Sequence, residues 1–215
     1  MKIRKIMAFF MILPTLIFAN TENDSQDKTD IQDNFYYSIE FPEIKINGKS
    51  LEEINKEFDK RMERTMNEFN KEFEQLKKSQ SENVIEHSTK INEYTNSFGI
   101  ISVVIENYQY TGGAHGNTKI ESHNYDIKEN KELKFDDIFK PEAKEMFETA
   151  ILQIVKDNNE KKYFDNIEKI NLDTAIMYFK EDNVIFKFPQ YEIAPYSSGM
   201  PEFNFHKDKV KEFLK

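Results

Sequence analysis

Residues Gly99 to Gly116 read GIISVVIENYQYTGGAHG, a β-branched run that ends in a cluster of glycines. The run predicts a β-strand, because Val and Ile side chains pack well on a pleated surface. Gly112, Gly113 and Gly116 are three of the chain's 6 glycines. Glycine is needed where the backbone takes a positive φ or where another group approaches it closely. We therefore expect a constrained loop at the end of this strand, serving either as architecture or as a recognition surface.

Further strands are predicted on both sides of this stretch. We expect residues 84–93, 99–110 and 118–127 to form one sheet. Residues 35–46 alternate well enough for another strand, and Pro42 favours an edge position for it. Towards the C-terminus, residues 178–180 and 184–188 flank a polar turn and predict a hairpin. Phe203 and Phe205 mark a last, short strand.

A long amphipathic helix is predicted after the turn Asn47-Gly48. Ser50 and Glu53 have the spacing of a capping box, in which each side chain bonds the other residue's backbone amide. Apolar side chains then recur every three or four residues and form one stripe. Its members are Leu51, Ile54, Phe58, Met62, Met66, Phe69, Phe73 and Leu76. We expect this stripe to pack on the sheet, with the Lys and Glu face in solvent.

Shorter helices are predicted in the C-terminal half. Asp136 is a suitable N-cap for a turn that runs to Phe139, and Pro141 opens the next helix. The expected buried face of that helix is Phe147, Ala150, Ile151, Ile154 and Val155. Residues 208–214 predict a closing helix. The fold class is therefore α+β: an antiparallel sheet with a long amphipathic helix and a second helix packed on it.

The N-terminus has the pattern of an export signal. Basic residues up to Lys5 precede an apolar run that ends at Phe18, which is too short for a comfortable membrane span. We expect cleavage after Ala19, although the large Ile17 leaves an uncleaved anchor as the alternative. Residues 20–34 are polar and predict a disordered tether. Residues 35–97 then form a strand and long-helix subdomain, and residues 98–215 a C-terminal domain that contains the glycine loop.

Charge and composition limit the partners. The formal net charge is -9, and removal of residues 1–19, which hold three basic and no acidic residues, changes it to about -12. Such a surface repels nucleic acid and anionic lipid and attracts cationic partners. The chain has no cysteine, so its stability outside the cell must come from a core supplied by 19 phenylalanines and 10 tyrosines.

Two groups of residues are candidates for chemistry. His115, His123 and Asp126 could form a metal site across one hairpin, but His123 and Asp126 have opposite strand parity and point to opposite faces. The simpler interpretation is that His115 bonds its own loop. Glu192 could bind sugar hydroxyls beside two tyrosines, or it could pair with a basic residue and lock its segment. The chain shows no cysteine and no G-x-S-x-G nucleophile elbow.

The segment around Glu192 reads FPQYEIAPYSSG from Phe188 to Gly199, and together with the glycine loop it resembles a family of unknown function, DUF3298. The resemblance covers residues 98–215. A weaker similarity, FPEI from Phe41 to Ile44 followed by a helix, suggests the family's usual N-terminal partner domain, family 4163. The residues that match the motifs are Tyr110, Gly112, Gly113, His115, Gly116, Tyr191, Glu192, Pro195, Tyr196 and Gly199.

The resemblance implies a cell-wall context, since the family includes the extracellular part of a lysozyme-binding receptor and an accessory region of a peptidoglycan deacetylase. We expect an exported, non-enzymatic binding domain without cofactor or metal, periplasmic, secreted or attached to a bacterial envelope. Its partner would be peptidoglycan or a cationic muramidase such as lysozyme, and acidity favours the second. The alternatives are a metal-dependent envelope hydrolase that uses His115 with Asp126 or Glu192, and a structural module without a small ligand.

Overall fold

The computed structural model describes residues 85–215 except 127, 130 and 159–161, together with residues 35–39, 45–46, 49–50 and single helical positions between 56 and 75. The predicted export signal, the tether and the apolar stripe of the long helix lie outside the described residues. The helical positions that are described are polar and exposed, as expected for the solvent face. They are Lys56, Lys60, Glu63, Arg64, Asn67, Lys71, Glu74 and Gln75.

The chain divides into two compact units, residues 1–90 with 107–117 and residues 91–106 with 118–215. This division is interleaved, because three long strands have residues in both units. The predicted boundary between a subdomain of residues 35–97 and a domain of residues 98–215 stays a prediction.

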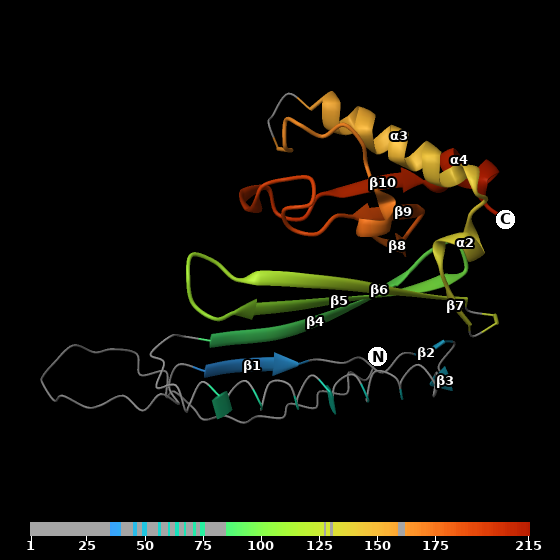
Figure 1. The fold of residues 1–215 in the computed structure, drawn as a ribbon. Helices are drawn as coiled ribbons and strands as arrows, with labels where there is room; N and C mark the ends of the chain where they lie inside the picture. The colour runs from blue at the N-terminus through green and yellow to red at the C-terminus, as the bar shows by residue number, and fades with distance from the viewer. Residues whose placement is uncertain are drawn as a thin grey trace, which may run out of the picture. The chain divides into compact units, whose positions relative to one another are not determined.

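A five-stranded sheet contains the three long strands expected from the sequence (Figure 1). Its members, in the order β1-β4-β5-β6-β7, are β1 (Phe35–Ile39), β4 (Ile85–Thr95), β5 (Ile100–Tyr110), β6 (Asn117–Asp126) and β7 (Lys131–Leu133). Strand β1 lies at an edge, as predicted, but it runs parallel to β4. The long connection between these two strands allows that crossover, whereas a short hairpin would force an antiparallel pair. The small hairpin β2 (Lys45–Ile46) and β3 (Lys49–Ser50) flanks the predicted Asn47-Gly48 turn.

A separate three-stranded antiparallel sheet contains β8 (Ile176–Lys180), β9 (Asn183–Lys187) and β10 (Glu202–His206), in the order β10-β9-β8. The predicted hairpin and short strand are therefore confirmed. Glu181, in the turn between β8 and β9, has a φ of 53°. A positive φ suits such a two-residue hairpin turn, because its twist matches that of the flanking strands.

Helix α2 (Phe135–Ile138) corrects one prediction. Its N-cap is Lys134, whose N–H donates to the Asp137 carboxylate at 2.9 Å, so the expected cap at Asp136 is wrong. The helix begins two residues earlier than expected, and its first residue, Phe135, packs against the core. Helix α3 (Glu142–Lys156) follows Pro141 as predicted. The closing segment is only partly α-helical, with α4 (Lys207–Val210) followed by a 3₁₀ turn, η4 (Lys211–Phe213).

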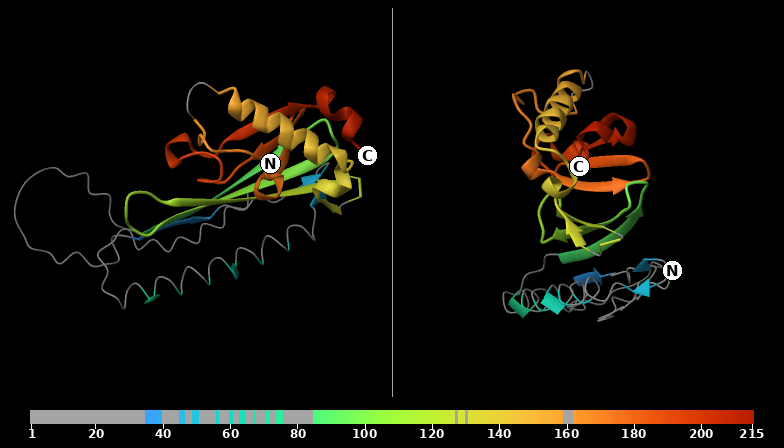
Figure 2. Two further views of the ribbon diagram at one scale, coloured as in Figure 1. Left: turned by 45° about the horizontal axis from the view of Figure 1, so that its top comes forward. Right: turned by 90° about the vertical axis from the view of Figure 1, so that its right-hand side faces the viewer.

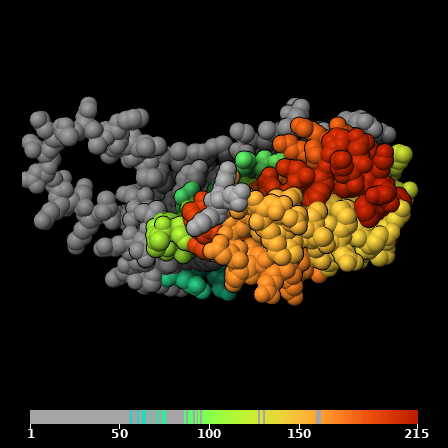
Figure 3. All heavy atoms as spheres, turned by 90° about the horizontal axis from the view of Figure 1, so that it is seen from above, coloured from blue at the N-terminus to red at the C-terminus, as the bar shows by residue number. Residues whose placement is uncertain are grey.

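Helix α3 packs on the three-stranded sheet and not on the sheet of long strands (Figures 1 and 2). Its buried residues are Ala143, Phe147, Ile151 and Val155, one every four positions. Ile154 was predicted on this face, but it is 46% exposed because it follows Ile151 by three residues on a stripe that advances by four. Figure 3 shows the molecule from the side that α3 covers.

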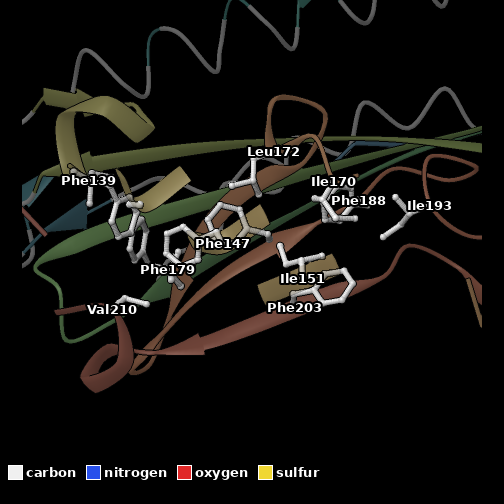
Figure 4. Close-up of a cluster of buried hydrophobic side chains, with 14 of the residues drawn as sticks. Phe139, Phe147, Ile151, Ile170, Leu172, Phe179, Phe188, Ile193, Phe203 and Val210 are labelled. Carbon is white, nitrogen blue, oxygen red and sulfur yellow. The ribbon is translucent and has the colours of Figure 1, made fainter. Parts of the chain in front are cut away.

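Aromatic rings fill the core beneath α3 (Figure 4). The ring of Phe147 is fully buried, 4.7 Å from Phe186 and 5.3 Å from Phe139, measured between centroids. Edge-to-face geometry such as that of Phe139 and Phe147 places the positive edge of one ring on the negative face of the other. The many phenylalanines thus supply the core of a chain without disulfides.

A buried polar network joins the two sheets. Ser102 of β5 donates its hydroxyl to the Asn124 side-chain oxygen at 2.6 Å and accepts the N–H of Phe179 at 2.8 Å. The Met177 carbonyl accepts from Asn124 at 2.9 Å and from Ser122 at 2.7 Å. Met177 and Phe179 belong to β8, the edge strand of the small sheet. Side chains of the large sheet therefore satisfy backbone groups that this edge would otherwise leave open.

Candidate functional site

The glycine loop between β5 and β6 has the constrained geometry that its sequence predicts. Gly112 and Gly113 have φ values of 99° and 100°, a region that side chains with a Cβ rarely adopt. Gly116 is needed for another reason, because a Cβ there would overlap the ring of Tyr108. The hydroxyl of Tyr110 donates to the Gly113 carbonyl at 2.9 Å and closes the loop. Whether this loop contacts a ligand stays a prediction.

His115 lies exposed in this loop, with Nδ1 3.0 Å from the Gly116 carbonyl oxygen. A carbonyl only accepts, so Nδ1 carries the proton in this contact. This geometry agrees with the simpler interpretation, in which His115 bonds its own loop.

The other members of the predicted metal site have different roles. His123 is buried in β6, with Nδ1 2.6 Å from the Glu132 carboxylate and Nε2 3.8 Å from that of Glu121. Asp126 accepts the N–H groups of Lys128 and Glu129 at 2.6 and 2.9 Å and thereby caps the turn after β6. Among the side chains that the structure describes, no group of three or more His, Asp or Glu residues is placed to hold a metal ion.

The segment 188–199 displays two tyrosine rings. Tyr191 has a φ of 66° and is 51% exposed, and its ring centroid lies 6.0 Å from that of Tyr196. The backbone on both sides is fixed. On one side, the N–H of Phe188 donates to the Pro201 carbonyl at 2.9 Å. On the other side, the Ile193 carbonyl accepts the N–H of Phe164 at 3.0 Å, and the next residue, Ala194, is fully buried. A backbone fixed on both sides therefore carries the exposed ring of Tyr191 and the half-buried ring of Tyr196.

Glu192 is exposed beside these rings. Its N–H donates to the Pro189 carbonyl at 3.3 Å, which shapes the turn. The carboxylate makes no ion pair with any residue in the described part of the chain, so the predicted lock finds no basic partner there. Gln190 ties the segment to β6, because its side-chain oxygen accepts the N–H of Thr118 at 3.2 Å.

The two predicted groups of site residues belong to different compact units. Tyr110, Gly112, Gly113, His115 and Gly116 form one group, and Tyr191, Glu192 and Tyr196 form the other. The structure brings together the members within each group.

A half-open pocket of about 640 Å³ was missed by the sequence analysis. Its lining comes from residues 120–124, 132–136, 172–173 and 175–177, with Lys144 and Phe186. These residues come from β6, β7, α2, α3, β8 and β9, and no spacing in the sequence joins them. The only signal was His123, which was considered as a metal ligand. Lys144 meets Asp173 at 2.7 Å on this lining, and that hydrogen bond raises the pKa of the Lys144 ammonium.

A second charged cluster lies in the same unit. The Lys187 ammonium is 3.2 Å from Glu106 and 3.0 Å from Glu202, and its side chain is only 13% exposed. Burial alone lowers the pKa of Lys187, but the hydrogen bonds and charges of Glu202 and Glu106 outweigh it, so the pKa is raised. Burial and then Glu202 raise the pKa of Tyr178 beside them. These contacts join β5 to β9 and β10.

Fold and site together define an α+β domain with an exposed aromatic segment and a half-open pocket. Residues 136–208 match the profile of the family described as protein of unknown function (DUF3298), and residues 28–118 match the profile described as deacetylase PdaC. The resemblance to DUF3298 and its partner domain that the sequence suggested is confirmed. Among the described residues, no helix has the length and apolar character needed to cross a membrane.

The chain is similar to the peptidoglycan-N-acetylmuramic acid deacetylase PdaC of Bacillus subtilis (strain 168), with 27% identity over 195 residues. The match covers 84% of this chain but 39% of the relative, so the chain spans well under half the length of that enzyme. The partial match to this enzyme suggests a context of peptidoglycan and the cell envelope. It does not show that this chain has the enzyme's activity.

Two solved structures are similar to parts of the chain. The crystal structure of a DUF3298 member from Bacteroides fragilis covers 80% of this chain and 70% of its own, with 20% identity and a TM-score of 0.50. A DUF3298 protein from Pseudomonas aeruginosa covers 66% of this chain and 67% of its own, with 24% identity and a TM-score of 0.49. The first likeness supports the α+β architecture and nothing about function.

Proposed function

We propose that this chain is an exported, non-catalytic binding module of the bacterial cell envelope that holds peptidoglycan glycan through the segment around Tyr191 and Tyr196. The observation that carries the proposal is the backbone of Tyr191, whose φ of 66° is unusual for a bulky residue in an exposed position. A left-handed conformation costs a non-glycine residue about 1–2 kcal/mol. Such strain clusters where a side chain must be presented in one particular way.

The chemistry of the segment suits a sugar. Tyrosine rings offer flat apolar faces on which pyranose rings stack, together with a hydroxyl at the wet end. Glu192 adds a carboxylate between them, which can accept hydrogen bonds from sugar hydroxyls. The rigid backbone on both sides limits the entropy lost on binding, because the rings are already held near one another.

The relative from Bacillus subtilis supports the choice of glycan, since its name places it on the N-acetylmuramic acid of peptidoglycan. Export through the predicted signal 1–19 would bring the chain to that polymer. The predicted glycine-loop residues, Tyr110, Gly112, Gly113, His115 and Gly116, remain candidates for additional contacts.

A cationic muramidase such as lysozyme is the second candidate, and one observation favours it. The net charge of -9 would steer a cationic protein towards this surface. Steering of this kind weakens as salt shortens the Debye length, whereas stacking on tyrosines depends little on salt. Salt dependence therefore separates the two partners.

The test is retention of the purified mature protein on cell-wall sacculi and on immobilised lysozyme, at low and at physiological salt. We expect binding to sacculi at both salt concentrations and at least a tenfold loss for Tyr191→Ala or Tyr196→Ala, in the range found for loss of a stacking aromatic anchor. Ile154→Ala is the matched control, because Ile154 is also a large exposed apolar side chain but lies on α3.

Three results would contradict the glycan proposal. Retention on lysozyme alone, falling with salt, would support the protein partner. Unchanged retention of both tyrosine variants on sacculi would move the site away from this segment. Stoichiometric zinc in the purified protein, with release of wall fragments, would support the alternative of a metal-dependent hydrolase built on His115 with Asp126 or Glu192.

A further inference from the structure

The outer edge of β6 contains an open window. Among the described residues, strand β7 pairs with Asn124, Tyr125 and Asp126, although β6 begins at Asn117 (Figure 1). At the other end, the N–H of Thr118 donates to the side-chain oxygen of Gln190. Between these two points, no strand in the described part of the chain pairs with this edge of β6. The window therefore comprises residues 119–123.

The direction of the backbone groups in the window follows from strand geometry. The Thr118 N–H points away from β5, since it meets Gln190. Backbone N–H and C=O groups of a strand alternate in direction with a period of two, so those of Ile120 and Ser122 point outward as well. These two residues present two donors and two acceptors, the set that an added peptide strand uses.

The 640 Å³ pocket lies along the same residues. Its volume is in the range of sites that bind small ligands. Leu133, Leu172, Ile176 and Phe186 give it apolar walls. Four carboxylates line it against two lysines and His123. Lys144 pairs with Asp173, and His123 lies 2.6 Å from Glu132 and 3.8 Å from Glu121, so the carboxylate of Asp136 is the one of the four that makes no ion pair among the described residues. The lining acidic residues are Glu121, Glu132, Asp136 and Asp173, and the lysines are Lys134 and Lys144.

We propose that this window and pocket bind the peptide stem of peptidoglycan, a short extended peptide that carries a free side-chain amine. The peptide backbone pairs with the outward groups of Ile120 and Ser122, and the amine lies among the carboxylates. This inference rests on the proposed function and extends it from the glycan to the peptide attached to it.

The length of the window favours a stem over a segment of a protein. Five residues at roughly 3.3 Å each give a window of about 16 Å. It is closed by β7 at one end and by Gln190 at the other. A peptide of three to five residues fits between these ends, whereas a continuous protein strand would meet β7. The acidic lining selects a peptide with an amine over one without it.

The test is a nuclear magnetic resonance titration of the ¹⁵N-labelled mature protein with the synthetic pentapeptide stem L-Ala-γ-D-Glu-L-Lys-D-Ala-D-Ala. We expect saturable shifts of the Ile120 and Ser122 amides. Acetylation of the lysine amine should weaken binding about three- to fivefold, the effect of one exposed ion pair. N-methylation of the amide after lysine removes a backbone donor and should weaken it further.

Variants of the protein test the same contact between the peptide amine and the carboxylates. Asp136→Asn should weaken binding of the free-amine stem about threefold and leave binding of the acetylated stem unchanged. Glu145→Gln is the matched control, since Glu145 is an exposed carboxylate of α3 that does not line the pocket. Melting temperatures of both variants show whether each one folds.

The outcomes separate this inference from the proposed function. Glycan strands freed of their stems should shift the amides near Tyr191 and Tyr196 but not those of Ile120 and Ser122. If these strands bind and the stem gives no shifts at millimolar concentration, the inference is overturned while the glycan proposal stands. If the stem binds and the glycan strands do not, the glycan proposal is overturned while the inference of a stem site stands. Tighter binding of a ten-residue basic peptide of L-amino acids than of the stem would also overturn it, in favour of a protein segment.

Discussion

The hydroxyl of Ser102 offers a sharp test of how the two sheets are joined. Ser102 is fully buried, donates to Asn124 and accepts from the Phe179 N–H, at 2.6 and 2.8 Å. Ser102→Ala leaves a buried amide and a buried carboxamide oxygen without their partner. Each such group costs about 1–3 kcal/mol, so we expect the free energy of unfolding to fall by about 2–6 kcal/mol.

Ser122→Ala is the matched control. The Ser122 hydroxyl donates to the Met177 carbonyl, but that carbonyl also accepts from Asn124 and keeps this bond in the variant. The loss is then one net hydrogen bond, about 0.5–1.5 kcal/mol. Both changes are Ser to Ala on neighbouring strands, so differences in side-chain entropy and strand propensity cancel.

Urea unfolding of the mature protein, followed by circular dichroism, measures both variants. With a slope of about 2 kcal/mol per molar, Ser102→Ala should lower the midpoint by about 1–3 M and Ser122→Ala by less than about 0.8 M. Equal midpoints for the two variants, or a smaller shift for Ser102→Ala, would show that the network does not carry the energy assigned to it.

Three further predictions concern the core, the glycine loop and α2. Phe147→Ala should cost about 3–5 kcal/mol in thermal unfolding, because the ring is fully buried among other rings; a loss below that of a surface change would contradict the packing. Gly113→Ala should cost about 1 kcal/mol or more, because its φ is 100° although nothing lies within 4 Å of the new Cβ; unchanged stability would mean the loop relaxes. The Lys134 N–H and then Lys131 lower the pKa of Asp137, so this carboxylate stabilises the fold above the ordinary value of 3.8 and the benefit is lost as pH falls through the lowered pKa. The difference in melting temperature between the wild type and Asp137→Asn should therefore shrink below pH 4, and a difference that grows there would refute the assignment.

The strands were predictable because their signals are local. The β-branched run of β5 and the polar turn between β8 and β9 each lie within a dozen residues and need no knowledge of the rest of the chain. The parallel pairing of β1 with β4 was not predictable, since antiparallel and parallel partners place the same residues on the same faces. The partner of α3 was missed for a related reason. Both sheets have apolar faces, and the apolar stripe of a helix does not determine which of the two faces it packs on.

The candidate site divides in the same way. The positive φ of Gly112 and Gly113 is predictable because glycine favours it. The positive φ of Tyr191 is not, because a bulky residue rarely adopts it. Backbone hydrogen bonds fix the segments on both sides of Tyr191. The pocket depends on residues as far apart as Ile120 and Phe186, which only the packing of two sheets brings together.

The edges of the two sheets in this unit are treated differently, and that difference bears on function. Proteins commonly protect edge strands, because open backbone groups invite unwanted pairing. The edge of β8 is protected: the carbonyl of Met177 and the N–H of Phe179 are both satisfied by side chains of the large sheet. The neighbouring edge of β6 is closed at Thr118 and again at Asn124, but not between them within the described part of the chain. An edge that is closed at both ends and left open over a pocket is better explained by a short ligand than by incomplete protection, because two more residues of β7 pairing would have covered Ser122.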